Sequence, residues 1–252
     1  MPHPAGSDLG LEAVLVKRLA QYTLEVSLRC APGATVILTG PSGSGKTTAL
    51  RCLAGLEPID GGRIRFNGGC WDDAATGRHT HPRDRGIGFL SQEYALFPHM
   101  TLRQNIRFAL HGPGDSAELL EAVGIGHLAH QRPHQISGGE RQRAALCQTL
   151  ASRPRLLLLD EPFSALDMEN RRLLREMLRH AQAESQLAIV QVTHDLAEAL
   201  SVPAQIVALR QGREDAGWLN RQKALLMDDL HRLQETRQEV QQESQAAEPI
   251  SA

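Results

Sequence analysis

The feature that most constrains the fold is a glycine-rich stretch between an apolar run and a helical one. Residues 40–47 fit the pattern G-x-x-x-x-G-K-[ST], the run Val36–Leu38 comes before them, and a helical stretch begins near Thr48. Glycines let the backbone curl so that successive N–H groups point at one spot, and a helix N-terminus adds the positive end of its dipole. This order predicts a strand, a phosphate-binding loop and a helix.

Two side chains at the end of the loop suit a nucleotide with its metal ion. Lys46 can reach the β- and γ-phosphates, and the Thr47 hydroxyl suits Mg²⁺. A turn that binds nothing has no need for this pair. The pattern alone does not separate a transport ATPase from a kinase, a GTPase or a helicase. The predicted nucleotide contacts in this stretch are Gly40, Pro41, Ser42, Gly43, Ser44, Gly45, Lys46, Thr47 and Thr48.

Short apolar runs bounded by turn residues alternate with longer amphipathic segments, which is typical of buried parallel strands with crossover helices. The runs are Ala34–Thr39, Ile87–Leu90, Leu156–Leu159, Leu187–Thr193 and Gln205–Leu209. Ahead of them, Glu12–Val16 and Tyr22–Leu28 favour a hairpin, with Arg63–Phe66 as a third strand. We therefore expect an α/β fold, a P-loop NTPase core with a mostly parallel sheet and an antiparallel β edge.

About sixty residues between the strands that end at Leu90 and begin at Leu156 show helical periodicity and no strand. Thr101 with Gln104, and Ser137 with Glu140, have the spacing of a capping box. This segment predicts an inserted helical subdomain over about 93–150, within an ATPase domain over 1–217. The composition is polar and rich in Gln and Glu after that, so we expect a polar C-terminal helix and a disordered tail over 218–252.

Composition limits the classes of partner. Lys and Arg number 27 against 29 Asp and Glu, so the net charge of -2 gives no broad field for nucleic acid, and no nucleic-acid partner is expected. The four cysteines are scattered, which argues against a zinc site and a disulfide framework and fits a reducing cytosol. No window approaches the roughly 18 apolar residues of a spanning helix, so any membrane role must come through a partner.

Two carboxylates follow the apolar strand Leu156–Leu159, at the strand end where ligands bind in open α/β sheets. Asp160 suits the role of holding Mg²⁺, and Glu161 is placed to orient and deprotonate an attacking water. The alternative is a solvated strand end with ordinary surface acids. A buried strand has no reason of its own to end in Asp-Glu.

Further motifs appear in the order and spacing of one family, over about Leu11 to Arg213. Residues 137–142 closely resemble the LSGGQ signature of ABC ATPases, with Ile136 in place of leucine and Glu140 in place of glutamine. Gln92, the run Ser164-Ala165-Leu166-Asp167 and His194 resemble the Q-loop, D-loop and H-loop of that family. A lone His194 would more often be a structural histidine, and a lone Gln92 a plain loop residue.

The resemblance implies a role for each motif. Ser137, Gly138 and Gly139 would form a second anion cradle for a γ-phosphate, and two chains placed head to tail would bring it to the ATP bound by the other's Lys46, which implies a homodimer. His194 would contact the γ-phosphate with Glu161 and Lys46 as further catalytic residues. Gln92 would act in catalysis and bind Mg²⁺ beside Thr47 and Asp160, and Tyr22 would stack on adenine. Burial of Tyr22 in the core is the rival interpretation.

The stretch 82–101 is similar to the Q-loop region of bacterial importers for molybdate, sulfate, polyamines and sugars, and Arg18–Tyr22 is most similar to molybdate and tungstate importers. This resemblance implies work at the cytoplasmic face of the cell membrane with integral membrane permease subunits and a solute-binding protein. Phe97, Pro98 and His99 would then line the groove for the membrane subunit, or simply pack within the subdomain. An ABC exporter and a soluble ABC ATPase remain the alternatives.

Overall fold

The computed structural model describes residues 10–92, 96–112, 114–164, 166–229 and 232. The chain forms two compact units, Met1–Glu214 and Asp215–Ala252. The first unit holds every predicted site residue.

A mainly parallel sheet runs through the first unit in the order β11-β10-β3-β9-β8-β7. Only the short β11 pairs antiparallel, with β10. The strands β3, β8 and β9 are buried at every position, which is why apolar residues fill most of their positions. Their bounds are β3 Thr35–Thr39, β7 Ile87–Leu90, β8 Leu156–Asp160, β9 Ala188–Val192, β10 Gln205–Arg210 and β11 Arg213–Glu214. The predicted parallel strands are confirmed.

The antiparallel strands form a sheet of their own, in the order β2-β1-β4-β5-β6. β1 pairs with β2 on one side and with β4 on the other, so the predicted hairpin and third strand are present. The bounds are β1 Leu11–Arg18, β2 Thr23–Cys30, β4 Gly61–Phe66, β5 Gly69–Asp73 and β6 Arg78–His79. The strands β5 and β6 were not expected from the sequence.

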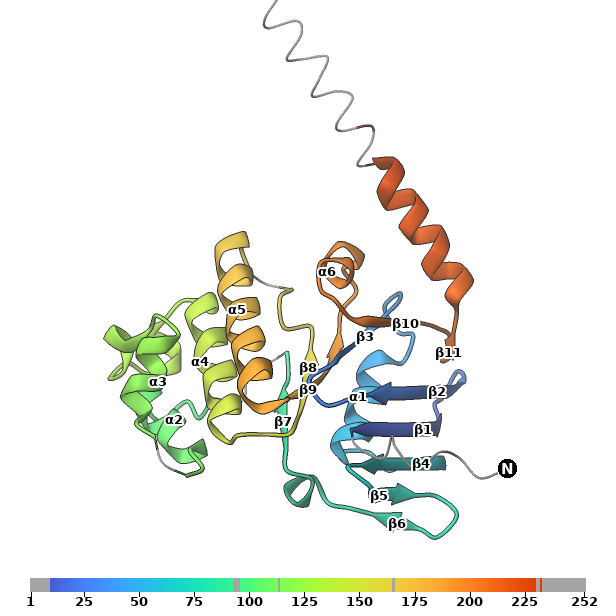
Figure 1. Ribbon diagram of the computed structural model, residues 1–252, viewed down its shortest axis with the longest axis horizontal. Helices are drawn as coiled ribbons and strands as arrows, with labels where there is room; N and C mark the ends of the chain where they lie inside the picture. Colours follow the sequence, from blue (N-terminus) through green and yellow to red (C-terminus); the bar gives the residue numbers. More distant parts are fainter. Residues whose placement is uncertain (1–9, 93–95, 113, 165, 230–231, 233–252) are drawn as a thin grey trace, which may run out of the picture. The chain divides into compact units, whose positions relative to one another are not determined.

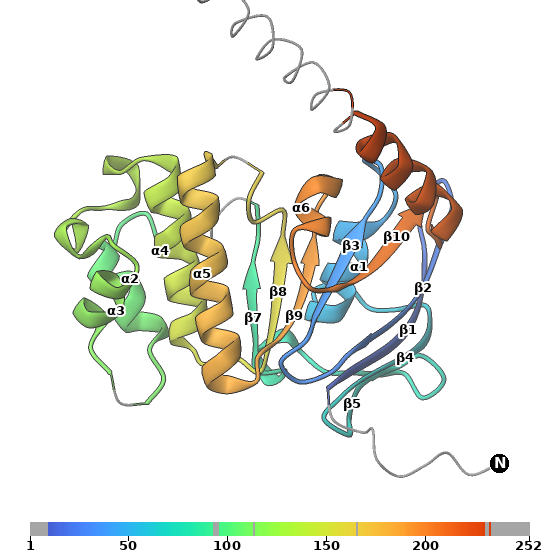
Figure 2. The same cartoon turned by 45° about the horizontal axis from the view of Figure 1, so that its top comes forward.

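The helices of the first unit are α1 Lys46–Ala54, α2 Leu102–Ala109, α3 Ser116–Ala122, α4 Gly138–Ala151, α5 Met168–Ser185 and α6 Leu196–Leu200, with 3-10 turns at Pro82–Asp84, Gly126–Leu128 and Pro133–Gln135. The helices α2 to α5 gather on one side of β7, β8 and β9, and the antiparallel sheet lies on the other (Figure 1, Figure 2). Both predicted capping boxes are present, at the starts of α2 and α4.

Strand β8 supplies two hydrophobic cores at once. Leu156 and Leu158 pack in the core shared with α1 and the antiparallel sheet, and Leu157 and Leu159 pack in the core shared with α4 and α5. Successive side chains of a strand point to opposite faces, so an unbroken run of leucine fits a strand covered on both sides. Because β8 is buried on both faces, its position in the fold is fixed, and with it the position of Asp160 and Glu161 at its end.

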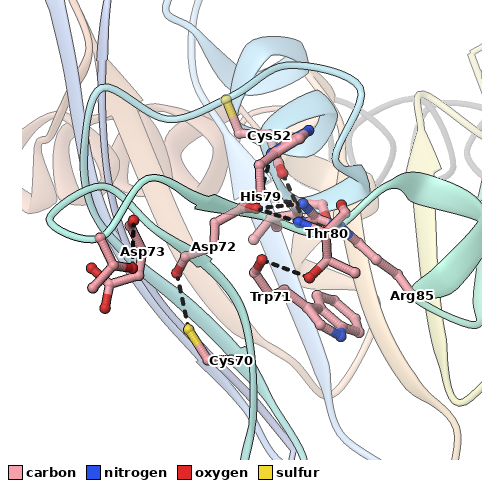
Figure 3. Close-up of polar contacts among 10 residues, drawn as sticks. Cys52, Cys70, Trp71, Asp72, Asp73, His79, Thr80 and Arg85 are labelled. Carbon is pink, nitrogen blue, oxygen red and sulfur yellow. Dashed lines mark hydrogen bonds and ion pairs between the residues drawn. The ribbon is translucent and has the colours of Figure 1, made fainter.

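A buried ion pair joins the antiparallel sheet to the end of α1 (Figure 3). Arg85 and Asp72 have side chains 0% and 1% exposed, and the guanidinium donates to both carboxylate oxygens at 2.8 Å. The same group donates to the Leu53 carbonyl at 2.8 Å and the Cys52 carbonyl at 3.2 Å. Cations at a helix C-terminus satisfy its free carbonyls. Arg85 therefore holds in place the helix whose other end is the phosphate loop.

In the second unit, residues 216–229 are helical. Asp215 caps this helix, because its side chain accepts a hydrogen bond from the Trp218 amide at 2.7 Å. The boundary at 217/218 stays a prediction, and the predicted tail lies mostly outside the described residues.

Candidate functional site

The predicted phosphate loop joins β3 to α1, and α1 begins at Lys46, close to the expected start. Gly40 and Gly45 have φ values of 140° and 99°. A Cβ at Gly40 would lie 2.0 Å from the Leu209 carbonyl oxygen, and one at Gly45 would lie 3.1 Å from a Leu24 methyl. Gly40 therefore needs glycine for backbone conformation and for space, and Gly45 needs it for its backbone conformation.

Lys46 lies over the loop and is only 6% exposed. Its Nζ donates to the carbonyls of Gly40 and Pro41, each at 2.9 Å, and to Ser44 Oγ at 3.4 Å. Burial lowers the pKa of Lys46, against the opposing effect of the nearby carboxylates Glu161 and Asp160. Among the described residues the acceptors of the Lys46 hydrogen bonds are neutral oxygens, so an anionic ligand would supply a stronger partner.

Thr47 and Asp160 meet across the gap between α1 and β8. The Thr47 hydroxyl donates to Asp160 Oδ1 at 3.1 Å, and Asp160 is 8% exposed. Burial raises the pKa of this carboxyl, although the hydrogen bond from Thr47 opposes the shift. Two hard oxygen groups this close suit Mg²⁺, which binds one or two carboxylate or hydroxyl oxygens and the phosphates of its substrate.

Glu161 follows β8 in a left-handed backbone conformation, with φ of 51°. Its amide donates to the Val192 carbonyl of β9 at 3.0 Å. Its Oε1 lies 3.0 Å from Nδ1 of His194, which follows β9. The structure therefore brings these two predicted residues into direct contact, from strands that are neighbours in the sheet. A non-glycine residue held at positive φ is a strained position of the kind found at functional sites.

The common position of these groups follows from the sheet order. Four parallel strands lie side by side in the order β3, β9, β8, β7, so their carboxyl ends meet at one edge of the sheet. The phosphate loop follows β3, His194 follows β9, the acidic pair ends β8, and Gln92 follows β7. Gln92 is exposed and makes no hydrogen bond within the described part of the chain. Gln92 therefore shares this edge of the sheet without a hydrogen bond to the other predicted groups.

Tyr22 lies against the phosphate loop. Its hydroxyl donates to the Gly43 carbonyl, and its ring approaches Gly212 so closely that a Cβ there would lie 2.5 Å from a ring carbon. The side chain is half-buried, and Tyr22 is not part of the hydrophobic core. The Tyr22 ring thus lies beside the phosphate loop and is partly exposed, so a nucleotide base could stack on it.

The predicted second cradle lies at the start of α4. Ser137 is the N-cap of this helix. A Cβ added at Gly138 would have no other heavy atom within 4 Å, whereas one added at Gly139 would lie 2.8 Å from Asn170 Nδ2 of α5. No hydrogen bond among the described residues links Ser137 to the phosphate loop. The two cradles are separate features of one chain.

The predicted D-loop connects the acidic pair to α5. Ser164 Oγ donates to the Glu161 carbonyl at 3.1 Å, and Asp167 caps α5 by accepting from the Asn170 amide at 2.8 Å. Ala165 lies outside the described residues. The loop thus begins at the backbone of one predicted catalytic residue and ends at a helix that contacts the signature motif.

Phe97 belongs to the helical segment, where its amide donates to Asn105 Oδ1 at 2.7 Å and its ring packs against Phe108 at 4.8 Å. Pro98 and His99 are exposed beside it, and Phe108 is 65% exposed. Phe97 thus packs within the segment, while its neighbours add to an exposed, partly aromatic surface.

A polar group behind His194 was not found by sequence reasoning. Glu198 is 3% exposed and accepts a hydrogen bond from Gln191 of β9, and burial raises its pKa to about 7. Arg171 of α5 lies 3.6 Å from Asp195 and donates to the Leu166 carbonyl at 3.0 Å. Asp195 and Glu198 have the spacing of a capping box. Only its backbone half forms, since the Glu198 carboxyl turns to Gln191.

Within the described residues, no helix has both the length and the hydropathy needed to cross a bilayer. Residues 24–164 match the family model described as "ABC transporter", which is more than half of the chain. That segment includes the phosphate loop, the signature motif and the acidic pair.

Curated relatives share the sequence over a similar range. The sulfate/thiosulfate import ATP-binding protein CysA of Nitrosomonas europaea is 43% identical over 213 residues, which cover 79% of this chain and 57% of the relative. The Fe(3+) ions import ATP-binding protein FbpC of Pseudomonas fluorescens is 46% identical over 195 residues, covering 75% and 54%. The chain thus spans only a little over half the length of these relatives.

Solved structures share the fold. The dimeric ATP-binding cassette MJ0796, in a post-hydrolysis state bound to ADP and Pi, aligns with a TM-score of 0.67 and 27% identity over 81% of this chain and 97% of that one. An ATP-binding subunit of an ABC transporter aligns with a TM-score of 0.69 and 26% identity, covering 82% and 88%. The predicted ABC cassette fold is therefore confirmed. With the family match and the loop geometry, these findings show that the chain belongs to the ABC transporter family.

Proposed function

We propose that the chain binds ATP and hydrolyses it to ADP and phosphate, as the ATP-binding subunit of a transporter. The observation that carries this proposal is the arrangement at one sheet edge. A buried lysine over a glycine loop, a hydroxyl–carboxylate pair and a carboxylate–imidazole pair lie at the ends of neighbouring strands. Phosphoryl transfer needs charge neutralisation, a metal site and an oriented water, and these groups provide all three.

Each group has one part in nucleotide binding. The loop from Gly40 to Thr48 holds the phosphates through its amides, with Lys46 on the β- and γ-phosphates. Lys46 then exchanges the Gly40 and Pro41 carbonyls for phosphate oxygens. Tyr22 stacks on adenine. Thr47, Asp160 and Gln92 would hold Mg²⁺, which would neutralise phosphate charge when bound.

Glu161 takes the proton of the attacking water, and His194 fixes the direction of its carboxylate. The 3.0 Å contact to His194 Nδ1 leaves the second carboxylate oxygen of Glu161 for water. The opposite ring nitrogen of His194 then faces the γ-phosphate. Because strain in the Glu161 backbone is already present before ATP arrives, its position needs little reorganisation during the reaction.

The complete site takes two copies of the chain, placed head to tail. Ser137, Gly138 and Gly139 lie at a helix N-terminus that is suited to phosphate but has no hydrogen bond to the loop of its own chain. Each copy then places this cradle against the ATP held by the other's Lys46. The MJ0796 cassettes, which share the fold, are described as dimers, which supports this assembly.

ATP hydrolysis by this dimer powers import of a small solute through integral membrane permease subunits, at the cytoplasmic face of the membrane and with a solute-binding protein. The names of relatives at 43–48% identity support the importer class, since they describe import of sulfate/thiosulfate or Fe(3+). An oxyanion such as molybdate falls within the proposed range of solutes.

The test is hydrolysis by the purified chain and by its Glu161→Gln variant. We expect Mg-ATP hydrolysis by the parent and a rate at least about 100-fold lower in the variant, because general-base catalysis contributes roughly 10²–10⁴. Nucleotide affinity should stay within about twofold, since the loop is intact. Near-normal turnover in the variant would reject Glu161 as the base, and no turnover in the parent under any condition would contradict the proposed activity.

A further inference from the structure

Two helices of the described chain begin with the same capping box but use different side chains as acceptors. At α2, the Thr101 amide donates to Gln104 Oε1 at 2.8 Å, and the Gln104 amide donates to Thr101 Oγ1 at 3.3 Å. At α4, the Ser137 amide donates to Glu140 Oε2 at 2.8 Å, and the Glu140 amide donates to Ser137 Oγ at 3.3 Å. The backbone half of the two caps has the same geometry, so a glutamine serves this box as well as a glutamate.

The hydroxyl groups of the two caps differ. Ser137 Oγ donates its proton to Glu140 Oε2 at 2.7 Å. Thr101 donates its hydroxyl to no acceptor among the described residues. The hydrogen bonds from the Ser137 hydroxyl and amide hold the pKa of Glu140 below its usual value, so the carboxylate is ionised near neutral pH. The hydroxyl proton of Ser137 is therefore already donated to a negatively charged group, the Glu140 carboxylate.

This commitment conflicts with the use proposed for Ser137. A serine hydroxyl has one proton, and donating it to a phosphate oxygen means breaking its bond to Glu140. The carboxylate also stays within one helical turn of the cradle, with the same sign of charge as the phosphate. Arg143 of the same helix donates to Asn170 of α5, and its charge acts on Glu140 without a hydrogen bond between the two side chains.

We propose that Glu140 is a positioning residue that restrains the signature cradle: it holds the Ser137 hydroxyl and adds a repelling charge, and so raises the ATP concentration at which two copies close. This inference rests on the proposed head-to-tail dimer. It acts through Ser137, without contact between Glu140 and the nucleotide. A glutamine at position 140 keeps the cap, as Gln104 does at α2, while it removes the charge.

The experiment measures ATP-dependent dimerisation by analytical ultracentrifugation in the Glu161→Gln background, where hydrolysis is slow. Glu140→Gln should lower the ATP concentration for half-maximal dimerisation about fivefold, the size of one like-charge repulsion weakened by water. Glu140→Ala should lower it as well, because the charge is removed there too. Gln104→Glu is the matched control, since it places the same charge in the corresponding cap at α2. It should leave the ATP concentration for half-maximal dimerisation (the half-point) unchanged.

The outcomes separate charge from helix stability. If Glu140 served only the cap, Glu140→Ala would raise the half-point and Glu140→Gln would leave it alone, which would overturn the inference. A half-point for Glu140→Gln equal to that of the parent would overturn it too. If neither the parent nor Glu140→Gln dimerises at any ATP concentration, both the head-to-tail dimer and this inference are rejected. If both dimerise with ATP at the same half-point, only this inference is rejected.

Discussion

At the scale of single residues, Glu161 owes its position to the backbone as much as to its partner. Its φ of 51° turns the chain sharply at the end of β8, and its amide is tied to the Val192 carbonyl. A left-handed conformation costs a non-glycine residue roughly 1–2 kcal/mol. The buried strands on both sides impose that conformation, and they leave the carboxylate beside His194.

The residues of the phosphate loop were predictable from the sequence because the motif is local. Lys46 and Thr47 are neighbours in the chain, and their spacing from the glycines specifies their task. The contact between Glu161 and His194 needed the order of the strands in the sheet, which the structure supplies. Gln191 with Glu198, and Arg171 with Asp195, gave no signal, since each pair joins different elements through tertiary packing.

Lys46→Met tests the loop at this scale. Methionine keeps the apolar stem but removes the charge that now lies on the carbonyls of Gly40 and Pro41. We expect ATP affinity to fall about 10- to 100-fold, the size of a lost charge-assisted hydrogen bond. Titration with a fluorescent ATP analogue measures this, and the thermal unfolding curve serves as the control for folding. Unchanged affinity would mean that Lys46 serves the loop's structure instead of its ligand.

At the scale of elements, the strands that could be predicted most clearly from the sequence are those buried on both faces. The run Leu156–Leu159 must be apolar throughout because each face packs in a different core. The strand β5 was not expected, since Asp72 and Asp73 are poor strand residues by composition. It is stabilised instead by the ion pair of Asp72 with Arg85, which lies outside the strand.

The segment around α6 carries a second test, because Glu198 is buried beside Gln191 and its pKa is raised from 4.5 to about 7. The unfolded carboxyl loses its proton above its usual pKa, whereas the folded one keeps it. Glu198 therefore favours the folded state fully below about pH 4.5, and this contribution is lost as the pH rises through 7. The stability of the protein should fall across that window for this reason.

Glu198→Gln isolates this effect, because glutamine keeps an oxygen for Gln191 and cannot ionise. We expect the variant to match the parent below about pH 4 and to exceed its free energy of unfolding at pH 8 by on the order of 3 kcal/mol. Urea unfolding at several pH values measures the difference. A gap between the two proteins that does not change with pH would show that Glu198 ionises normally in the folded chain.

At the scale of the whole molecule, the first unit carries two proposed phosphate cradles, and no hydrogen bond among its described residues connects them. The loop at the start of α1 and the signature at the start of α4 belong to different parts of the fold. Each is half of the proposed ATP site. Cooperation between copies of the chain follows from this division, since neither half completes the site without a partner.

The most direct test of that claim mixes two inactive variants, Lys46→Met and Ser137→Arg, and measures ATP hydrolysis. Each variant alone lacks one half of both composite sites. In a mixed dimer, the intact Lys46 of one copy meets the intact Ser137 of the other, so one site is complete. The account predicts that the mixture regains hydrolysis that neither variant shows alone. A mixture no more active than the sum of its parts, at every ratio tried, would contradict it.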